Sequence, residues 1–336
     1  MSSIDQNIFT EEFLKIDPAS VGRAIVDQGY FSFARAVKPE FLEKLNAEIR
    51  QYKPGANLNT VAPVWFNEQY FFPHAMATSK SYFDYITSPF LRTVSAVKFP
   101  NGFRLKCHRY YETRHGHSME WHADNVTNDG KVTGVDGLIF ILYVNDVFDG
   151  EFQLVLGSYE ERRQGQWTYN YTNDYIEKNY ASRVKSFAMP AGSIVVYDTY
   201  GIHRAKPIVT NGYTRKSIFF QVDSDERFAE QIYLNPAFFD SNDPDLLQYL
   251  GFGKKHDYLA NPVATINDMP APQLLRFMAE VVAAMIYRFR YGLFHSLLTH
   301  DQRMKWVRWR RETLIAFNSK YPQAYRALNW FKRKVA

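Results

Sequence analysis

The residues with the clearest chemical potential lie in the segment Trp121-His122-Ala123-Asp124. Side chains two positions apart on an extended chain project to the same side, so His122 and Asp124 can bind one metal ion together. His203 follows later in the chain and can supply a third ligand. Two histidines and one carboxylate are typical of non-haem iron(II) sites, which leave the opposite face of the metal open. An isolated His-x-Asp pair also arises by chance, as a surface hydrogen bond or a turn.

Arg215 and Ser217 form a second pair with chemical potential, on a segment that reads as a strand beginning after His203. Both side chains lie on the same face of that strand. A guanidinium forms a two-pronged pair with a carboxylate, and a neighbouring hydroxyl can donate to the same oxygens. A dicarboxylate co-substrate needs one anchor at the metal and another at its far end. We therefore predict that Arg215 and Ser217 bind the far carboxylate.

The strands that must position these residues lie between residues 100 and 225. This part of the chain shows one strand pattern after another, separated by short turns, which indicates a sandwich or barrel and not alternating βαβ units. Residues 160–185 interrupt the series with a polar insertion rich in Tyr and Asn, which we expect to form a flexible flap. The strand patterns are Gly102–Tyr111, Leu138–Val144, Phe152–Leu156, Ser193–Asp198 and Lys216–Val222.

The first of these strands has two faces that the sequence cannot tell apart. Lys106, His108 and Tyr110 share one face, and Cys107 and Arg109 lie on the other. We assign the first face to the site and predict that Tyr110 contacts the co-substrate. The alternative is that this face points to solvent.

Other polar residues near the site allow more than one interpretation. His115 and His117 form a His-x-His pair that could bind a second metal, although a loop at the mouth of the pocket fits this pattern better. Asp198 lies on the strand that leads to His203 and could orient that imidazole as a carboxylate partner.

Four segments together resemble the phytanoyl-CoA dioxygenase family of 2-oxoglutarate oxygenases. They are Gly29–Val37, Trp121–Asp124, Gly150–Ser158 and Gly192–Ser217, and the similarity covers roughly residues 18–225. The resemblance implies a double-stranded β-helix, a jelly-roll or cupin-like core that is mainly β. It also implies Fe(II) held by His122, Asp124 and His203, with 2-oxoglutarate and O₂ as co-substrates.

The reaction that the resemblance implies is hydroxylation of a C–H bond, with release of succinate and CO₂. Desaturation, ring closure and demethylation use the same iron site and stay open. The substrate would be a small molecule or a carrier-linked metabolite. Tyr159 stands where the family has a histidine after Gly-Ser, but that histidine is not a metal ligand. The presence of Asp124 excludes a halogenase, which would have a small residue there.

Helical patterns flank the predicted β core. Two helices surround a short strand within residues 18–49, and Ser88-Pro89 predicts a capped helix start. After residue 225 the strand patterns stop. We therefore expect an oxygenase core in residues 1–225 and a C-terminal helical region in 226–336, whose helices offer a surface for a homodimer.

Composition limits the setting of the protein. Cys107 is the one cysteine, so no internal disulfide forms and a cytoplasmic setting follows. The N-terminal residues lack the apolar stretch of a signal peptide, and Val281–Tyr287 is too short to span a bilayer. We expect no integral membrane segment.

Charge is distributed unevenly along the chain. Residues 301–336 carry ten Lys or Arg against Asp301 and Glu312, a balance of +8, whereas the whole chain carries +5. A basic tail can attract lipid or nucleic acid, but a solvated helix whose Trp residues pack inward explains Trp306 and Trp309 better than nucleic-acid binding does. Two alternative functions therefore stand: a non-catalytic β-sandwich binding module, and an oxygenase recruited to a lipid or macromolecule by these helices.

Overall fold

The computed structural model describes residues 2–52, 69–72, 74–115, 117, 119–124, 135–163, 170–224, 232–240, 242–252 and part of 271–325. Two compact units divide the chain. The first comprises Met1–Ala56 and Val64–His256, and the second comprises Asn57–Pro63 and Asp257–Ala336. The helix α10 (Pro244–Tyr249) lies beyond the predicted boundary at residue 225, and its Leu246 and Tyr249 belong to the hydrophobic core of the first unit.

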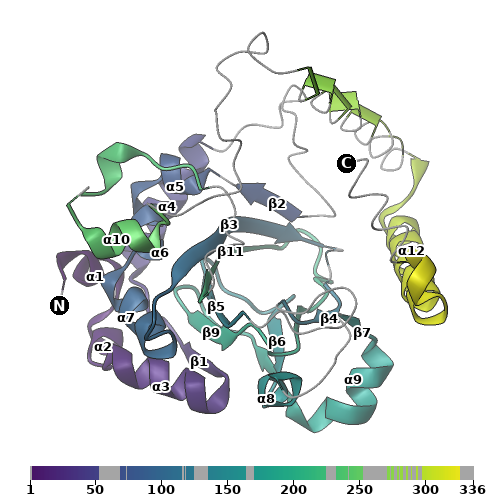
Figure 1. The fold of residues 1–336 in the computed structure, drawn as a ribbon, viewed down its shortest axis with the longest axis horizontal. Helices are drawn as coiled ribbons and strands as arrows, with labels where there is room; N and C mark the ends of the chain where they lie inside the picture. Colours follow the sequence, from purple (N-terminus) through teal and green to yellow (C-terminus); the bar gives the residue numbers. More distant parts are fainter. Residues whose placement is uncertain are drawn as a thin grey trace. The chain divides into compact units, whose positions relative to one another are not determined.

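Two antiparallel sheets form the first unit (Figure 1). The first sheet has the order β1 (Tyr30–Phe33), β9 (Ile194–Asp198), β5 (Gly137–Tyr143), β11 (Thr214–Asp223), β3 (Arg104–Arg114) and β2 (Gln69–Phe72). The second has the order β7 (Asn170–Tyr171), β4 (Trp121–His122), β10 (His203–Ala205), β6 (Phe152–Val155) and β8 (Val184–Phe187).

The chain passes repeatedly from one sheet to the other. From β3 to β6 and again from β8 to β11, successive strands belong to alternate sheets. This alternation is the connection pattern of a jelly roll and is consistent with the predicted double-stranded β-helix. The flanking helices make the chain as a whole a mixture of helix and sheet.

N-terminal helices lie against the outer face of the first sheet, as Figure 1 shows. Local signals set their ends. The Asp17 carboxylate accepts hydrogen bonds from the amides of Ala19 and Ser20 at the start of α3, and Gly29 ends that helix at a φ of 78°. The expected helix start at Ser88-Pro89 is confirmed, because the Ser88 hydroxyl caps the helix that begins at Pro89. These helices are α1 (Ser3–Ile8), α2 (Glu11–Leu14), α3 (Pro18–Gln28), α4 (Pro39–Tyr52), α5 (Ala75–Thr78), α6 (Lys80–Ile86) and α7 (Pro89–Lys98).

The strand β11 shows how the first sheet divides its side chains between two environments. Ile218, Phe220 and Val222 belong to the hydrophobic core beneath the helices, whereas Ser217 and Phe219 face the interior between the sheets. Both faces of the central strands are buried, so each strand presents one face to the core and one to the interior.

In the insertion at residues 160–185, the described residues 160–163 and 170–185 form regular secondary structure where a flap was expected. Its described residues form α8 (Ser158–Arg163), α9 (Asn173–Tyr180) and the 3₁₀ turn η1 (Ala181–Arg183), and its short strand β7 pairs with β4. Tyr171, Ile176 and Tyr180 pack with Trp121 in a separate hydrophobic cluster. These apolar contacts pack the described part of the insertion against β4, the strand that carries the metal motif. The prediction of a flexible flap is therefore corrected for these residues.

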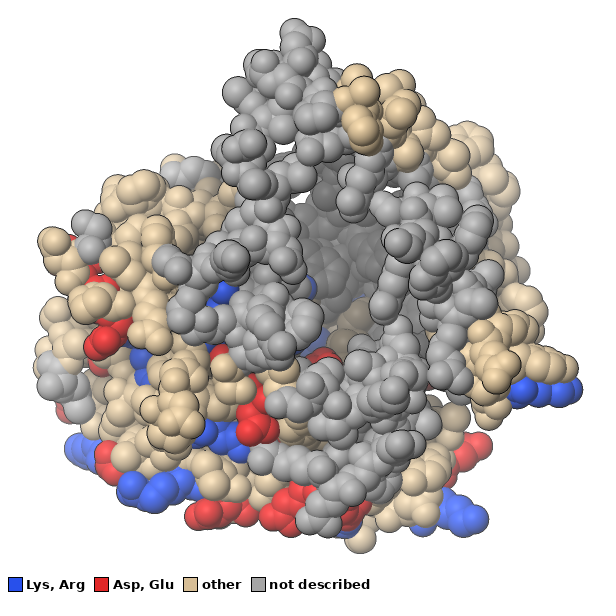
Figure 2. Space-filling model, in the orientation of Figure 1, with Lys and Arg blue, Asp and Glu red and all other residues tan. Residues whose placement is uncertain are grey.

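The second unit contains the helix α12 (His300–Lys320), which begins with a capping box between Thr299 and Gln302. Trp306 and Trp309 are 40% and 60% exposed, so the expectation that these rings pack inward is wrong. In the described part of the chain, no helix combines the length and the apolar character needed to cross a membrane. On the face drawn in Figure 2, basic and acidic side chains of the first unit are interspersed.

Candidate metal centre

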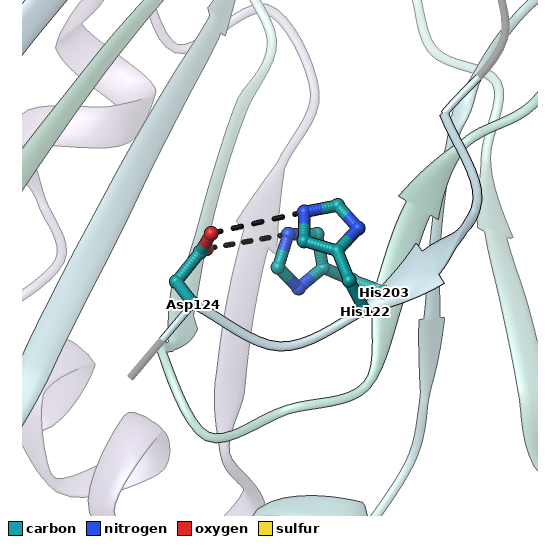
Figure 3. A group of neighbouring side chains, drawn as sticks. All are labelled: His122, Asp124 and His203. Carbon is teal, nitrogen blue, oxygen red and sulfur yellow. Dashed lines mark ion pairs between the residues drawn. The ribbon is translucent and has the colours of Figure 1, made fainter. Parts of the chain in front are cut away.

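The three predicted metal ligands lie together where β4 ends and β10 begins, on two neighbouring strands of the second sheet (Figure 3). His122 on β4 and His203 on β10 are direct cross-strand partners, and their ring centroids are 4.3 Å apart. Asp124 follows β4 by two residues, and its carboxylate oxygens lie 3.7 Å from Nε2 of His122 and 3.3 Å from Nε2 of His203. Strand pairing thus brings two residues distant in sequence onto one side of one carboxylate.

Backbone carbonyls fix the orientation of both imidazoles. Nδ1 of His122 lies 2.7 Å from the carbonyl oxygen of Glu120, and Nδ1 of His203 lies 3.0 Å from that of Gly201. A carbonyl oxygen only accepts, so each Nδ1 carries the proton and each Nε2 keeps its lone pair. Both Nε2 lone pairs therefore lie on the side of Asp124, which is the arrangement that a metal requires.

Without a cation, this arrangement places the Nε2 lone pairs of the two histidines opposite the carboxylate oxygens of Asp124, and all of these atoms are acceptors. Asp124 Oδ2 is buried and accepts no hydrogen bond from any residue that the structure describes. Burying an unsatisfied acceptor costs about 1–3 kcal/mol. Two neutral imidazole nitrogens and one carboxylate fit a divalent first-row metal, and the mixed donor set suits iron(II). The residues present thus fit the ion that the sequence predicts.

The turn between β9 and β10 holds two of the three candidate ligands. The carbonyl of Gly201 accepts from His203, and the carbonyl of Thr199 accepts from the amide of Asp124 at 3.2 Å. Asp198 begins this turn, accepts from the amide of Tyr200, and forms a buried ion pair with Lys98 at 2.9 Å. The orienting partner of His203 Nδ1 is thus a backbone carbonyl, whereas the sequence suggested the Asp198 carboxylate.

A cavity of about 310 Å³ opens beside the candidate ligands, between the two sheets. It contains all three of them together with Arg215 and Ser217. Its lining residues are Lys106, Cys107, Arg109, Tyr111, Met119, His122, Asp124, Ile141, Tyr143, Phe152, Tyr197, His203, Ala205, Arg215, Ser217, Phe219 and Gln221.

Arg215 is a buried cation in the wall of this cavity. It is 6% exposed, and its Nη1 donates to the carbonyl of Gly150. Its Nε has no hydrogen-bond partner among the described residues. Burial lowers the pKa of Arg215 from its usual value, but a guanidinium stays protonated in proteins. A buried cation with such a donor is stabilised when an anion binds beside it. Ser217 lies two residues away on the same wall of the cavity.

Tyr110 lies on the other face of β3, which corrects the predicted assignment of faces. It is 1% exposed, belongs to the core beneath the helices, and its hydroxyl lies 3.5 Å from Asn46 Oδ1. Its neighbour Tyr111, the partner of Ser217 in the strand register, lines the cavity instead.

A shift in register near the start of β3 changes which side chains share a face. Gln221 pairs with Cys107, but the next residue of β11 pairs with Leu105, so Lys106 is skipped. Such a bulge re-aims side chains, and Lys106 and Cys107 both line the cavity. His108 is buried beside Tyr82, 3.2 Å from its hydroxyl.

The possibility that His115 and His117 bind a second metal ion is not supported by the residues that the structure describes. In the parts of the chain that are described, His122, Asp124 and His203 are the one group of three or more ligand-type residues close enough to hold an ion. Nδ1 of His115 lies 2.9 Å from the carbonyl oxygen of Val209.

Tyr197 is a site residue that the sequence analysis missed. It lies on β9, lines the cavity, and its hydroxyl is 3.1 Å from Nε2 of His203. Burial raises the pKa of Tyr197 well above its usual value, with a further contribution from the Asp124 charge. The alternation of β9 puts Tyr197 on the same face as Val195, but nothing in the sequence says which face looks inward.

No protein-family model matches the sequence, and no curated protein sequence matches it. The structure is similar to solved structures of iron- and 2-oxoglutarate-dependent oxygenases. HygX from Streptomyces hygroscopicus, with nickel and 2-oxoglutarate bound, is 14% identical with a TM-score of 0.47 over 66% of this chain and 90% of HygX.

Two further solved structures have comparable similarity. SnoK, a non-haem α-ketoglutarate-dependent carbocyclase from nogalamycin biosynthesis, is 12% identical with a TM-score of 0.48 over 63% of this chain and 85% of SnoK. AviO1 from Streptomyces viridochromogenes is 15% identical with a TM-score of 0.45 over 65% of this chain and 98% of AviO1. Because these sequence identities and TM-scores are low, the functional assignment depends on the residues of the site itself.

Proposed function

We propose that this protein is an Fe(II)- and 2-oxoglutarate-dependent dioxygenase. It hydroxylates a C–H bond of a small-molecule or carrier-linked metabolite and releases succinate and CO₂. One observation supports the proposal: a single cavity contains both the His122–Asp124–His203 cluster and the buried guanidinium of Arg215, whose Nε has no partner among the residues that the structure describes. A metal site alone would fit many functions, whereas a metal site that shares a cavity with a buried cation fits a chelating dicarboxylate.

Each residue has a role that follows from its chemistry. His122, Asp124 and His203 would hold the iron through two nitrogens and one oxygen and leave its other positions open. Iron, when bound, supplies the centre at which O₂ is activated for oxidation of the substrate C–H bond. Arg215 and Ser217 would hold the far carboxylate of 2-oxoglutarate by charge-assisted and hydroxyl hydrogen bonds.

Part of the remaining wall of the cavity is apolar and would help to exclude water. Ile141, Phe152 and Phe219 supply this apolar surface. In a low-dielectric cavity, the attraction between Arg215 and a carboxylate is stronger than it would be in water. The same apolar wall protects a reactive centre from side reactions with solvent.

Anaerobic titration with Fe(II) and 2-oxoglutarate tests the proposal directly. We expect a weak visible charge-transfer band that requires both components and is lost in His203→Ala. A second variant, Asp124→Asn, should lose the band while its metal-free form melts at no lower temperature, because an amide carries no charge and can donate where the carboxylate can only accept. A well-folded wild-type protein that gives no band and binds no 2-oxoglutarate would instead favour the non-catalytic binding module.

A further inference from the structure

The hydroxyl of Tyr197 occupies the side of His203 that a metal would use. Because Nδ1 of His203 gives its proton to the Gly201 carbonyl, Nε2 is an acceptor, and Tyr197 donates to it at 3.1 Å. The phenol ring is 1% exposed and packs against the imidazole, with ring centroids 4.8 Å apart. Phe152 also packs against both rings, with centroids 4.6 Å from that of Tyr197 and 5.6 Å from that of His203.

One lone pair cannot serve both partners. When a metal takes Nε2 of His203, the Tyr197 hydroxyl loses its acceptor while remaining in a buried position. A buried donor without an acceptor is costly, so the hydroxyl must find another oxygen. Tyr197 lines the cavity, and an anion that binds there beside the metal cluster supplies such an oxygen.

We propose that Tyr197 couples metal binding to co-substrate binding. In the bare site its hydroxyl hydrogen-bonds His203 and opposes the metal. In the loaded site the hydroxyl donates to the carboxylate of 2-oxoglutarate that chelates the metal. Tyr197 thus makes the bare site a poorer metal site and the metal-loaded site a better dicarboxylate site. This inference rests on the proposed function, because it assigns a residue to the same metal and the same co-substrate.

The variant Tyr197→Phe removes the hydroxyl and keeps the packed ring. We expect its affinity for Fe(II) alone to rise about two- to tenfold, because a competing hydrogen bond is lost. We expect the affinity of the iron-loaded variant for 2-oxoglutarate to fall by a similar factor. Calorimetric titration under anaerobic conditions measures both constants without any turnover, and the charge-transfer band of the ternary complex should shift as well.

Tyr85→Phe is the matched control. Tyr85 on α6 is also fully buried, belongs to the core beneath the helices, and its hydroxyl has no hydrogen-bond partner among the described residues. Removing that hydroxyl should leave both affinities unchanged. If Tyr197→Phe melts well below wild type, the same two constants are measured for both proteins at a temperature at which the variant is fully folded.

The two changes of opposite sign separate coupling from a structural role. A merely structural tyrosine would lower both affinities together, and an uninvolved one would change neither. Either result overturns the coupling by Tyr197, provided that the wild-type protein binds Fe(II) and 2-oxoglutarate. Failure of the wild type to bind them would overturn the proposed function itself.

Discussion

The two candidate histidine ligands are oriented by carbonyls of their own local backbone, Glu120 for His122 and Gly201 for His203. Each carbonyl lies two residues before its histidine, so the tautomer is set within a three-residue segment. The Nε2 atoms of both rings therefore face Asp124, and Arg215 is a buried cation in the wall of the same cavity. Under the proposed function, the histidines and Asp124 would bind the metal, and Arg215 would bind the far carboxylate of the co-substrate.

Arg215→Ala is expected to weaken 2-oxoglutarate binding about 10- to 150-fold, which corresponds to the loss of hydrogen bonds to a charged group. Fe(II) affinity should change little, because Arg215 is not among the candidate ligands. Binding titrations with each component measure the two effects separately. Lys216→Ala, at the adjacent position of β11 and outside the cavity lining, is the control. An Arg215→Ala protein with unchanged 2-oxoglutarate affinity would refute the co-substrate assignment.

At the scale of elements, α7 supports the metal site from outside the cavity. Its last residue, Lys98, forms the ion pair with Asp198, and the two side chains are 6% and 0% exposed. Asp198 begins the turn whose carbonyls hold His203 and the amide of Asp124. A helix in the N-terminal layer is thereby connected to two candidate ligands.

Lys98→Met is expected to lower the free energy of unfolding by about 3–5 kcal/mol, because it removes the lysine that compensates the buried Asp198 charge. The loosened turn should also weaken Fe(II) binding. Chemical denaturation and metal titration measure the two effects. The double variant Lys98→Met/Asp198→Asn removes the uncompensated charge and should recover most of the stability. If the single variant is as stable as wild type and binds Fe(II) equally well, the turn does not depend on this pair.

The register of β3 gives a second test at this scale, with two adjacent tyrosines. Tyr111→Phe is expected to alter 2-oxoglutarate affinity by about two- to tenfold. The Tyr111 side chain lines the cavity beside Ser217, its cross-strand partner. Tyr110→Phe should leave that affinity unchanged, because Tyr110 lies in the helix-side core. The reverse outcome in binding titrations would show that the strand presents its other face.

At the scale of the whole molecule, the lining residues of the cavity that the structure describes lie between Lys106 and Gln221, within the first compact unit. The second unit carries the basic tail, whose charge of +8 contrasts with the balance of −3 in the preceding 300 residues. Chemistry and basic charge are thus assigned to different parts of the chain.

Deletion of residues 301–336 is therefore expected to leave Fe(II) and 2-oxoglutarate affinities within about twofold of wild type, since a change outside the site adds less than about 0.5 kcal/mol. Titrations of the truncated protein test this, and its melting temperature serves as the control for folding. A large loss of 2-oxoglutarate affinity in a folded truncated protein would mean that the tail contributes to the cavity.

Local physics was enough to predict several parts of this fold. The start of α7 follows from the capping side chain of Ser88 followed by Pro89. The alternation of β11 gave the shared face of Arg215 and Ser217, and the His-x-Asp spacing gave a ligand pair. These features depend on neighbours within a few residues, so the sequence by itself determined them.

Only the tertiary structure decided which face of each strand looks into the cavity. Central strands such as β5 are buried on both faces. The alternation of residue types along such a strand therefore does not show which face points into the cavity. The bulge at Lys106 depends on the pairing of β3 with β11, and the approach of Tyr197 to His203 depends on how the two sheets pack. Contacts between residues distant in sequence are set by the packing of the whole core, which no short segment encodes.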